Sequence, residues 1–442
     1  MALFFGNGKL LQTAVLAFLC IIFSAAVMAL PSFAVPEIPD MDGAEAVYFY
    51  NVEQKTVMAE KNAELQIYPA STTKLMTGLV ALDVLSERLE ETVTVTDEML
   101  KDVSGNNIGL KSGERVTLLD MLYGTLCGGA NDAASVLAHT AAGDIESFVS
   151  LMNKKATELG AIDTHYTNVS GMHNPEMVTT AYDTFLIAKA ASEDSLFIEI
   201  TSESKYEMPK TNLSAERNVY NKNFLISRYS ETKYFNKYAK GLNSGSTSQG
   251  GYCLATCTEN EGQTYICVVM GAEEIDGNVL SYSVANSLID WAYSSYGYVE
   301  VLSSDHLVCE VSVDLSEDVD YVTLRPANEL TVFLPLDVDL ESELVYSHKV
   351  TFPTLEAPVE EGQVAGFITV ELDGKVLGTV DLVAMNKVER SEFLYGLKRI
   401  RDFTTSRPFI IAAVTFGVLI AVYIFGTAIY RKEPSRRRRR HR

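Results

Sequence analysis

The segment Pro69-Ala70-Ser71-Thr72-Thr73-Lys74 places a serine and a lysine three positions apart. A serine hydroxyl is a weak nucleophile at neutral pH and needs a base that removes its proton. Residues three apart on a helix share one face, so the side chains of Ser71 and Lys74 can meet there. A lysine in a partly desolvated cleft has a lowered pKa and can act as that base when it is neutral. The same spacing also occurs by chance at the solvated start of a helix, so the rest of the chain must decide between the two interpretations.

The sequence around this pair predicts an α+β domain over residues 40–297. The apolar residues that follow Lys74 recur with the period of a buried helix face, from Leu75 to Leu82. Strands are expected at residues 46–50, 57–60, 252–258 and 265–270, and further helices within residues 117–141, 145–159 and 280–296. Strands, then helices, then strands and a final helix are typical of an antiparallel sheet with a helical subdomain.

From about Tyr298 the pattern changes to short runs of alternating hydrophobicity. The clearest of them, residues 367–372 and 375–383, flank the turn Asp373-Gly374 and predict a β-hairpin. Residues 298–385 are therefore expected to form a small, all-β, sandwich-like domain.

Both ends of the chain carry membrane signals. Lys9 precedes an apolar run, and the small residues at 32–34 predict a signal peptide over residues 1–34 that is cleaved after Ala34; an uncleaved anchor is the alternative. Residues 386–407 predict a basic amphipathic helix at the membrane surface, and the uncharged residues 408–430 predict one transmembrane helix. The arginine-rich residues 431–442 predict a cytoplasmic tail, which places the rest of the chain outside the cell membrane, on the wall side.

The composition excludes several classes of function. The formal net charge of the chain is -22 and its last residues are strongly basic, so the body before them is acidic and unsuited to nucleic acid. The six cysteines show no metal-ligand spacing, and those after Cys20 are interpreted as small buried hydrophobic residues rather than a disulfide framework. His139 and His173 are expected to cap or pack, no H-x-x-x-H pair is present, and no glycine-rich phosphate loop follows a strand. The sequence predicts no metal and no cofactor.

Several further motifs accompany the Ser71 segment. They are Gly109-Leu110-Lys111-Ser112-Gly113-Glu114, Asn131-Asp132-Ala133-Ala134, Asn168 to Gly171 with His173, and Thr180-Ala181-Tyr182-Asp183. With these motifs the chain resembles the low-molecular-mass penicillin-binding proteins, the serine-type D-alanyl-D-alanine carboxypeptidases of peptidase family S11. The resemblance covers residues 40–385 and implies a penicillin-binding, β-lactamase-like transpeptidase domain followed by the family's β domain.

The resemblance implies an acyl transfer in which Ser71 attacks the carbonyl between two terminal D-alanines and Lys74 acts as its base. The family's second motif, S-x-N, aligns with Gly129-Ala130-Asn131, so Asn131 is kept and is expected to hydrogen-bond Lys74 and the substrate amide. The motif's serine is replaced by Gly129, which removes a hydroxyl thought to return the proton to the leaving amine. Ser104-Gly105-Asn106 also spells S-x-N, but it precedes the Gly109 match and is interpreted as a loop unrelated to the motif.

The family's third motif, K-T-G, aligns with Asn243-Ser244-Gly245 and is followed by Ser246. By this resemblance Ser244 holds the substrate carboxylate, Gly245 allows a close backbone approach, and the backbone N–H of Ser246 forms an oxyanion hole with that of Ser71. Asn243 replaces the motif's cation. Lys222 matches a family position that is usually basic and is expected to restore some positive potential for the carboxylate.

The sequence thus favours a membrane-tethered D-alanyl-D-alanine carboxypeptidase that acts on peptidoglycan stem peptides, with β-lactams as covalent inhibitors. Because two of the three motifs are altered, one alternative is an impaired homologue that only binds cell-wall peptides. A β-lactamase or esterase with the same Ser-Lys pair is the other alternative. No obvious Glu-x-x-x-Asn deacylation element supports it, and a β domain before the membrane suits a polymeric wall substrate.

Overall fold

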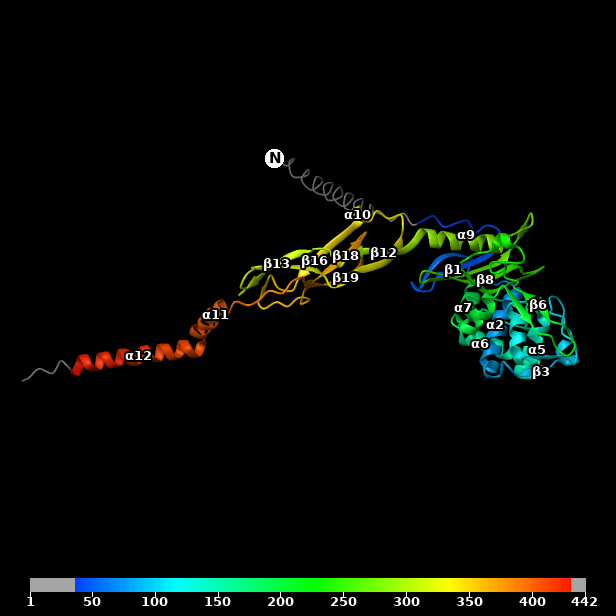
Figure 1. Ribbon diagram of the computed structural model, residues 1–442, viewed down its shortest axis with the longest axis horizontal. Coiled ribbons are helices and arrows are strands. Elements are labelled where there is room, and N and C mark those ends of the chain that lie inside the picture. Colours follow the sequence, from blue (N-terminus) through cyan, green and yellow to red (C-terminus); the bar gives the residue numbers. More distant parts are fainter. Residues whose placement is uncertain (1–35, 431–442) are drawn as a thin grey trace, which may run out of the picture. The chain divides into compact units, whose positions relative to one another are not determined.

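The computed structural model describes residues 36–430 and divides them into two compact units. The first unit comprises residues 36–297 with Pro335–Asp337, and the second comprises the remainder (Figure 1). The predicted signal peptide, with its cleavage site, and the basic tail lie outside the described residues.

An antiparallel sheet of five strands organises the first unit. The chain forms β1 (Ala46–Asn51), β2 (Thr56–Lys61), β7 (Ala239–Thr247), β8 (Gly251–Asn260) and β9 (Gln263–Ala272), and their order in the sheet is β2-β1-β9-β8-β7. Gly245 is paired with Cys253 in the β7–β8 register, and β7 forms one edge of the sheet. An edge strand leaves one row of backbone N–H and C=O groups available to an added peptide.

Helices cover both faces of this sheet. The long helix α9 (Leu280–Ser295) packs on one face, where its Tyr282 shares a hydrophobic cluster with Phe49 and Tyr265 of the sheet. The other face packs against the helical subdomain, in which α2 (Thr73–Leu85) is buried on almost every side. A helix that is apolar on nearly all sides is stable only inside a core. Its burial there holds the start of α2 beside the edge strand β7. The other helices of the subdomain are α3 (Asp97–Leu100), α4 (Leu118–Leu126), α5 (Asn131–Ala142), α6 (Ile145–Glu158), α7 (Ala181–Ser192) and α8 (Ser195–Ser202).

Short elements complete the first unit. They are the 3-10 turns η1 (Ala70–Thr72), η2 (Ser86–Arg88) and η3 (Thr232–Tyr234), and the strand pairs β3 (Thr92–Thr94) with β4 (Arg115–Thr117), β5 (Lys205–Met208) with β6 (Arg217–Tyr220), and β10 (Glu274–Ile275) with β11 (Asn278–Val279). The predicted strands and helices of this unit are all present.

The second unit is built on a six-stranded sheet around its own hydrophobic core. The strand order is β16-β18-β19-β14-β13-β17, and β18 with β19 forms the predicted hairpin at Asp373-Gly374. The strands are β13 (Cys309–Asp314), β14 (Tyr321–Pro326), β16 (Leu344–Val350), β17 (Thr354–Glu356), β18 (Val364–Leu372) and β19 (Lys375–Ala384), beside a pair formed by β12 (Tyr296–Leu302) and β15 (Leu330–Pro335) and a short helix α10 (Leu340–Glu343). Alternate residues such as Val311 and Val313 point into the core, as the alternating pattern requires.

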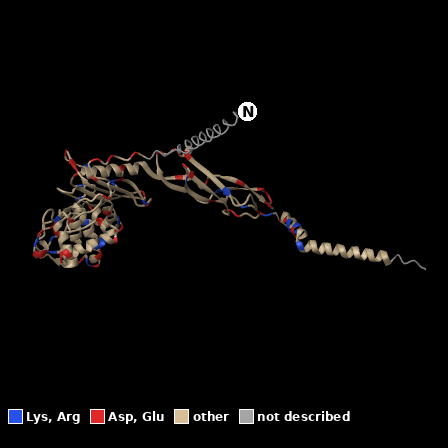
Figure 2. Cartoon of the chain, turned by 180° about the vertical axis from the view of Figure 1, so that it is seen from behind, with Lys and Arg blue, Asp and Glu red and all other residues tan. Residues whose placement is uncertain are grey.

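Two helices follow this sheet. In α11 (Glu392–Thr405) the large apolar side chains of Phe393, Leu397 and Ile400 are exposed, whereas α12 (Arg407–Tyr430) carries a single charge, at its first residue. In Figure 2 the ribbon of α12 has no blue or red segment beyond that start. Within residues 36–430, α12 is the one helix long and apolar enough to cross a membrane.

One local expectation is corrected. Ser71 lies in the 3-10 turn η1 and not on the α-helix itself, which begins at Thr73. Ala70 has a left-handed backbone, with φ 47°, and this turns the chain sharply into η1. Ser71 therefore stands on a bend at the start of α2, with its side chain half-buried.

Candidate active site

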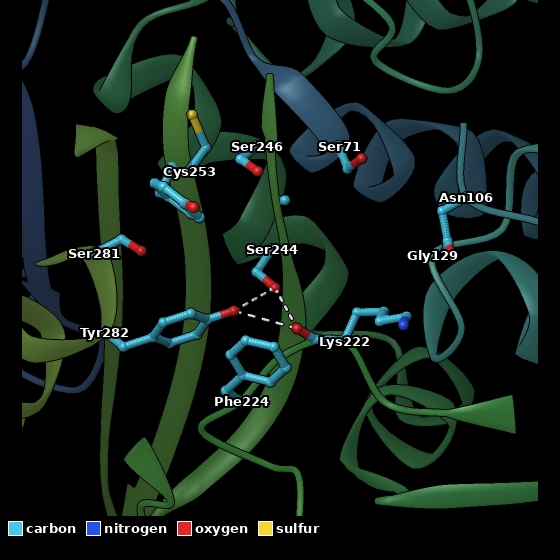
Figure 3. A pocket seen from close by; sticks show the side chains of 12 residues that line it. Ser71, Asn106, Gly129, Lys222, Phe224, Ser244, Ser246, Cys253, Ser281 and Tyr282 are labelled. Atoms are coloured by element: carbon cyan, nitrogen blue, oxygen red, sulfur yellow. Dashed lines mark hydrogen bonds between the residues drawn. The ribbon is translucent and has the colours of Figure 1, made fainter. Parts of the chain in front are cut away.

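Ser71 lines a cleft of about 330 Å³ between the edge of β7 and the helical subdomain (Figure 3). The lining comes from segments far apart in the sequence: Ser71, Asn106, Gly129, Lys222, Phe224, Ser244, Gly245, Ser246, Tyr252, Cys253, Ser281 and Tyr282. Five predicted site residues therefore meet here, namely Ser71, Lys222, Ser244, Gly245 and Ser246. Of the predicted residues, Lys74, Asn131 and Asn243 are buried behind this lining.

Lys74 contacts the serine from behind. Its Nζ lies 3.2 Å from Ser71 Oγ and 2.6 Å from the carbonyl oxygen of Ser170. The Lys74 side chain is fully buried, and this desolvation lowers its pKa to about 7. A large fraction of Lys74 is then neutral at pH 7 and able to accept the serine proton.

The Ser170 carbonyl is held in place by its own loop. The side-chain oxygen of Asn168 accepts hydrogen bonds from the backbone N–H groups of Ser170 and Gly171, at 3.1 and 2.8 Å. A Cβ at Gly171 would lie 1.8 Å from the carbonyl oxygen of Ala70, so only glycine lets this loop rest on η1. The Asn168–Gly171 motif thus positions the carbonyl that accepts from Lys74, a role that the sequence did not suggest.

The second motif lies at the start of α5. Asn131 Nδ2 donates to the carbonyl oxygen of Ser104 at 2.6 Å, and none of the described residues donates a hydrogen bond to its buried Oδ1. The expected hydrogen bond between Asn131 and Lys74 is not made in this structure. A buried carboxamide oxygen without a donor is a costly feature, and a substrate N–H would relieve it.

The loop at Ser104-Gly105-Asn106, which the sequence analysis interprets as unrelated to the motif, lies at the cleft. Asn106 lines the cleft beside Gly129, and its Nδ2 donates to the carbonyl oxygen of Gly128 at 2.7 Å. Its backbone oxygen accepts the N–H of Asn131 at 2.7 Å. The loop thus supports Asn131 and contributes a polar side chain beside Gly129, which has no hydroxyl of its own.

The third motif occupies β7. A Cβ at Gly245 would lie 2.4 Å from Ser71 Cβ, so glycine is needed for the serine to rest against this strand. Asn243 is buried, and its Nδ2 donates to the carbonyl oxygen of Leu126 at 3.3 Å. At this position the side chain braces α4 against β7 and does not reach the cleft lining.

Ser244 belongs to a network with α9. Its Oγ donates to the carbonyl oxygen of Lys222 at 2.9 Å and accepts from the hydroxyl of Tyr282 at 2.8 Å. Burial raises the pKa of Tyr282 to about 12, so this hydroxyl remains a donor. Tyr282 was not predicted, because only the tertiary fold brings α9 to the third motif.

Lys222 is the one charged residue in the described lining of the cleft. Its carbonyl faces Ser244, but its ammonium group points to the other side, toward Gly129 and Asn106 (Figure 3). The side chain can therefore attract an anion into the cleft. Its ammonium group does not point toward Ser244, where the sequence analysis expects the substrate carboxylate.

Comparison with known proteins assigns the family. Residues 35–274 match the family described as D-alanyl-D-alanine carboxypeptidase, and residues 296–390 match the C-terminal domain of penicillin-binding protein 5. The chain belongs to the D-alanyl-D-alanine carboxypeptidase family. The predicted fold class, with its all-β second domain, is confirmed.

Relatives align over most of their length. The chain is 30% identical to D-alanyl-D-alanine carboxypeptidase DacC of Escherichia coli, over 83% of this chain and 88% of the relative. It is 27% identical to carboxypeptidase DacF of Bacillus subtilis, over 78% and 85%. The crystal structure of penicillin-binding protein 5 from Haemophilus influenzae superposes with a TM-score of 0.55 at 24% identity, covering 81% of this chain and all of that one. That of the D-alanyl-D-alanine carboxypeptidase from Mycobacterium tuberculosis superposes at 0.53 and 30% identity, covering 60% and 95%.

Proposed function

We propose that this chain is a D-alanyl-D-alanine carboxypeptidase that removes the terminal D-alanine from peptidoglycan stem peptides through an acyl-enzyme on Ser71. The observation that carries the proposal is the fully buried Lys74, whose Nζ lies 3.2 Å from Ser71 Oγ. A desolvated amine in contact with a serine on a sharp bend is the arrangement that an activated nucleophile needs.

In the first step Lys74 accepts the proton of Ser71, and Oγ forms a bond to the carbonyl carbon of the penultimate D-alanine. The developing oxyanion lies between the backbone N–H groups of Ser71 and Ser246, which need no particular side chain. When the C–N bond breaks, Lys74 returns its proton to the amine of the departing D-alanine. Water then attacks the ester on Ser71, and the shortened peptide leaves.

The peptide lies along the exposed edge of β7, where Gly245 leaves room for it beside Ser71. Asn131 accepts a hydrogen bond from a substrate amide with its free Oδ1. The terminal carboxylate lies at Ser244, whose hydroxyl turns away from the Lys222 carbonyl to reach it. Asn243 contributes no charge there, and Lys222, the one charged residue of the described lining, adds positive potential only from the far side of the cleft.

The replacements at Gly129 and Asn243 favour a slow enzyme over an efficient one, and they are the reason to test a second candidate, a wall-binding protein without turnover. Loss of one such partner costs on the order of 10² to 10³ in rate. The nucleophile, its base and Asn131 remain, and their loss would be the more damaging.

The chain is further proposed to be held in the cell membrane by α12, with both compact units on the wall side and residues 431–442 in the cytoplasm. The proposal rests on the apolar length of α12 and on the arginine-rich segment after it. β-Lactams are expected to acylate Ser71 because they present a strained amide to the same nucleophile.

The test is D-alanine release from diacetyl-lysyl-D-alanyl-D-alanine by the full chain in detergent. Release should vanish in Ser71→Ala and persist in Ser150→Ala, an exposed serine on α6. Absence of release from the folded wild type, with a labelled penicillin still bound, would favour the wall-binding candidate. Absence of both would refute the assignment of Ser71.

A further inference from the structure

Two hydroxyl groups and one carbonyl oxygen form a closed triangle of hydrogen bonds at the third motif (Figure 3). The hydroxyl oxygen of Tyr282 lies 2.8 Å from Ser244 Oγ and 3.2 Å from the carbonyl oxygen of Lys222. Ser244 Oγ lies 2.9 Å from the same carbonyl oxygen. Both hydroxyl side chains are buried, so the three groups depend on one another for their hydrogen bonds.

Each hydroxyl of the triangle has one proton to donate. When Ser244 donates to the Lys222 carbonyl, Tyr282 donates to Ser244 Oγ, and every group in the triangle has a partner. The Tyr282 hydroxyl keeps its proton at neutral pH because burial raises its pKa to about 12. Within residues 36–430, these two hydroxyls are the only donors to the Lys222 carbonyl oxygen.

A carboxylate bound at Ser244 changes this balance. It accepts the hydrogen bond that Ser244 otherwise donates to Lys222, and a buried carbonyl left without a donor costs free energy. The Tyr282 hydroxyl already lies 3.2 Å from that carbonyl oxygen. It can therefore replace Ser244 as the donor by turning its proton about the C–O bond, while all heavy atoms of the triangle stay in place.

The ring of Tyr282 is held for this exchange by an aromatic cluster at the start of α9. Its centroid lies 5.3 Å from that of Phe224 and 5.0 Å from that of Tyr234. Tyr234 is itself fixed, since its hydroxyl accepts the backbone N–H of Val279 at 2.6 Å and donates to Asn278 Oδ1 at 3.1 Å. A donor that is already in position loses little conformational entropy when the ligand binds.

We propose that Tyr282 is a positioning residue for substrate binding, which frees the Ser244 hydroxyl for the terminal carboxylate by taking over its hydrogen bond to the Lys222 carbonyl. The inference rests on the proposed function, in which Ser244 holds that carboxylate. Tyr282 acts through Ser244 and not on the reacting atoms. Without the Tyr282 hydroxyl, either the carboxylate or the Lys222 carbonyl lacks a donor in the complex.

Tyr282→Phe tests this role because it keeps the ring and removes only the hydroxyl. Kd for diacetyl-lysyl-D-alanyl-D-alanine is measured by calorimetry on the full chain in detergent, with Ser71→Ala present to prevent turnover. Adding Tyr282→Phe should weaken binding about tenfold, the effect of one buried acceptor left unpaired. In a protein that also carries Ser244→Ala, Tyr282→Phe should change Kd by less than about twofold, because no hydroxyl is then redirected on binding.

The same contrast should appear in turnover by the enzyme with Ser71 intact. Tyr282→Phe should raise KM about tenfold and leave kcat within about twofold, since the nucleophile and its base are unchanged. The matched control is Tyr293→Phe, which removes another α9 hydroxyl, one that donates to the carbonyl oxygen of Gln263 at 3.1 Å. This control should keep the Kd and KM of its parent protein.

A Kd that Tyr282→Phe leaves unchanged would overturn the inference. An equal loss of affinity with and without the Ser244 hydroxyl would also overturn it, because a merely structural role of Tyr282 predicts that result. The proposed function fails separately, when the wild type releases no D-alanine. The Kd values do not depend on turnover and would still decide the role of Tyr282 in that case.

Discussion

Lowering the pH from 7 to 5 should slow the acylation of Ser71 about 50-fold. The pKa of Lys74 is lowered to about 7 by its burial. With that pKa, about half of Lys74 is neutral at pH 7 and about 1% at pH 5, and only the neutral form accepts the serine proton. An ordinary lysine with a pKa of 10.5 would be neutral in only about 0.03% of molecules at pH 7, so burial raises the reactive fraction roughly a thousandfold.

The burial of Lys74 also destabilises the fold, and this cost determines how the free energy of unfolding changes with pH. Between pH 7 and about 10.5 the unfolded chain binds more protons at Lys74 than the folded chain, so the free energy of unfolding should rise with pH over this window. The drop in pKa from 10.5 to about 7 corresponds to about 5 kcal/mol below pH 7. Lys74→Met should therefore lose acylation and unfold at a higher temperature.

The assay is the second-order rate constant for acylation by a fluorescent penicillin, measured from pH 5 to 9 on the full chain in detergent. Lys74→Arg introduces a cation that stays protonated, so its rate constant for acylation should be at least 10²-fold lower than that of the wild type at every pH. Lys154 is an exposed lysine of α6, and the rate constant of Lys154→Ala should match that of the wild type. A rate that is flat through pH 7, or a Lys74→Arg protein within tenfold of the wild type, would refute Lys74 as the base.

Three further predictions follow from single contacts. Arg217→Met leaves the fully buried carboxylate of Glu114 without its ion pair and should lower the free energy of unfolding by about 3 kcal/mol, whereas adding Glu114→Gln should recover part of it in denaturant titrations. Gly245→Ala introduces a Cβ 2.4 Å from that of Ser71 and should abolish acylation and lower the free energy of unfolding by about 1–3 kcal/mol; unchanged acylation would contradict the packing of the serine on β7. Deletion of residues 407–442 should move the protein from the membrane to the soluble fraction, and persistent sedimentation would assign the anchor elsewhere.

The sequence by itself predicted the elements and singled out Ser71 and Lys74 as the candidate catalytic pair. Alternating and helical apolar patterns predicted β1, β8, β9, α2 and α9, because burial of one face selects a period of two or 3.6 residues. The spacing of Ser71 and Lys74 is local, so it survives the step from sequence to structure even though Ser71 proved to lie in a 3-10 turn. The apolar length of α12 is likewise a local property.

Only the tertiary structure decided what surrounds that pair. The pKa of Lys74 depends on complete burial, which is a property of the packed subdomain and not of any motif. Tyr282 and the Asn106 loop reach the cleft from distant segments, and no local pattern records such contacts. The direction of the Lys222 side chain was also beyond the sequence, because side-chain orientation is set by neighbours that folding brings together.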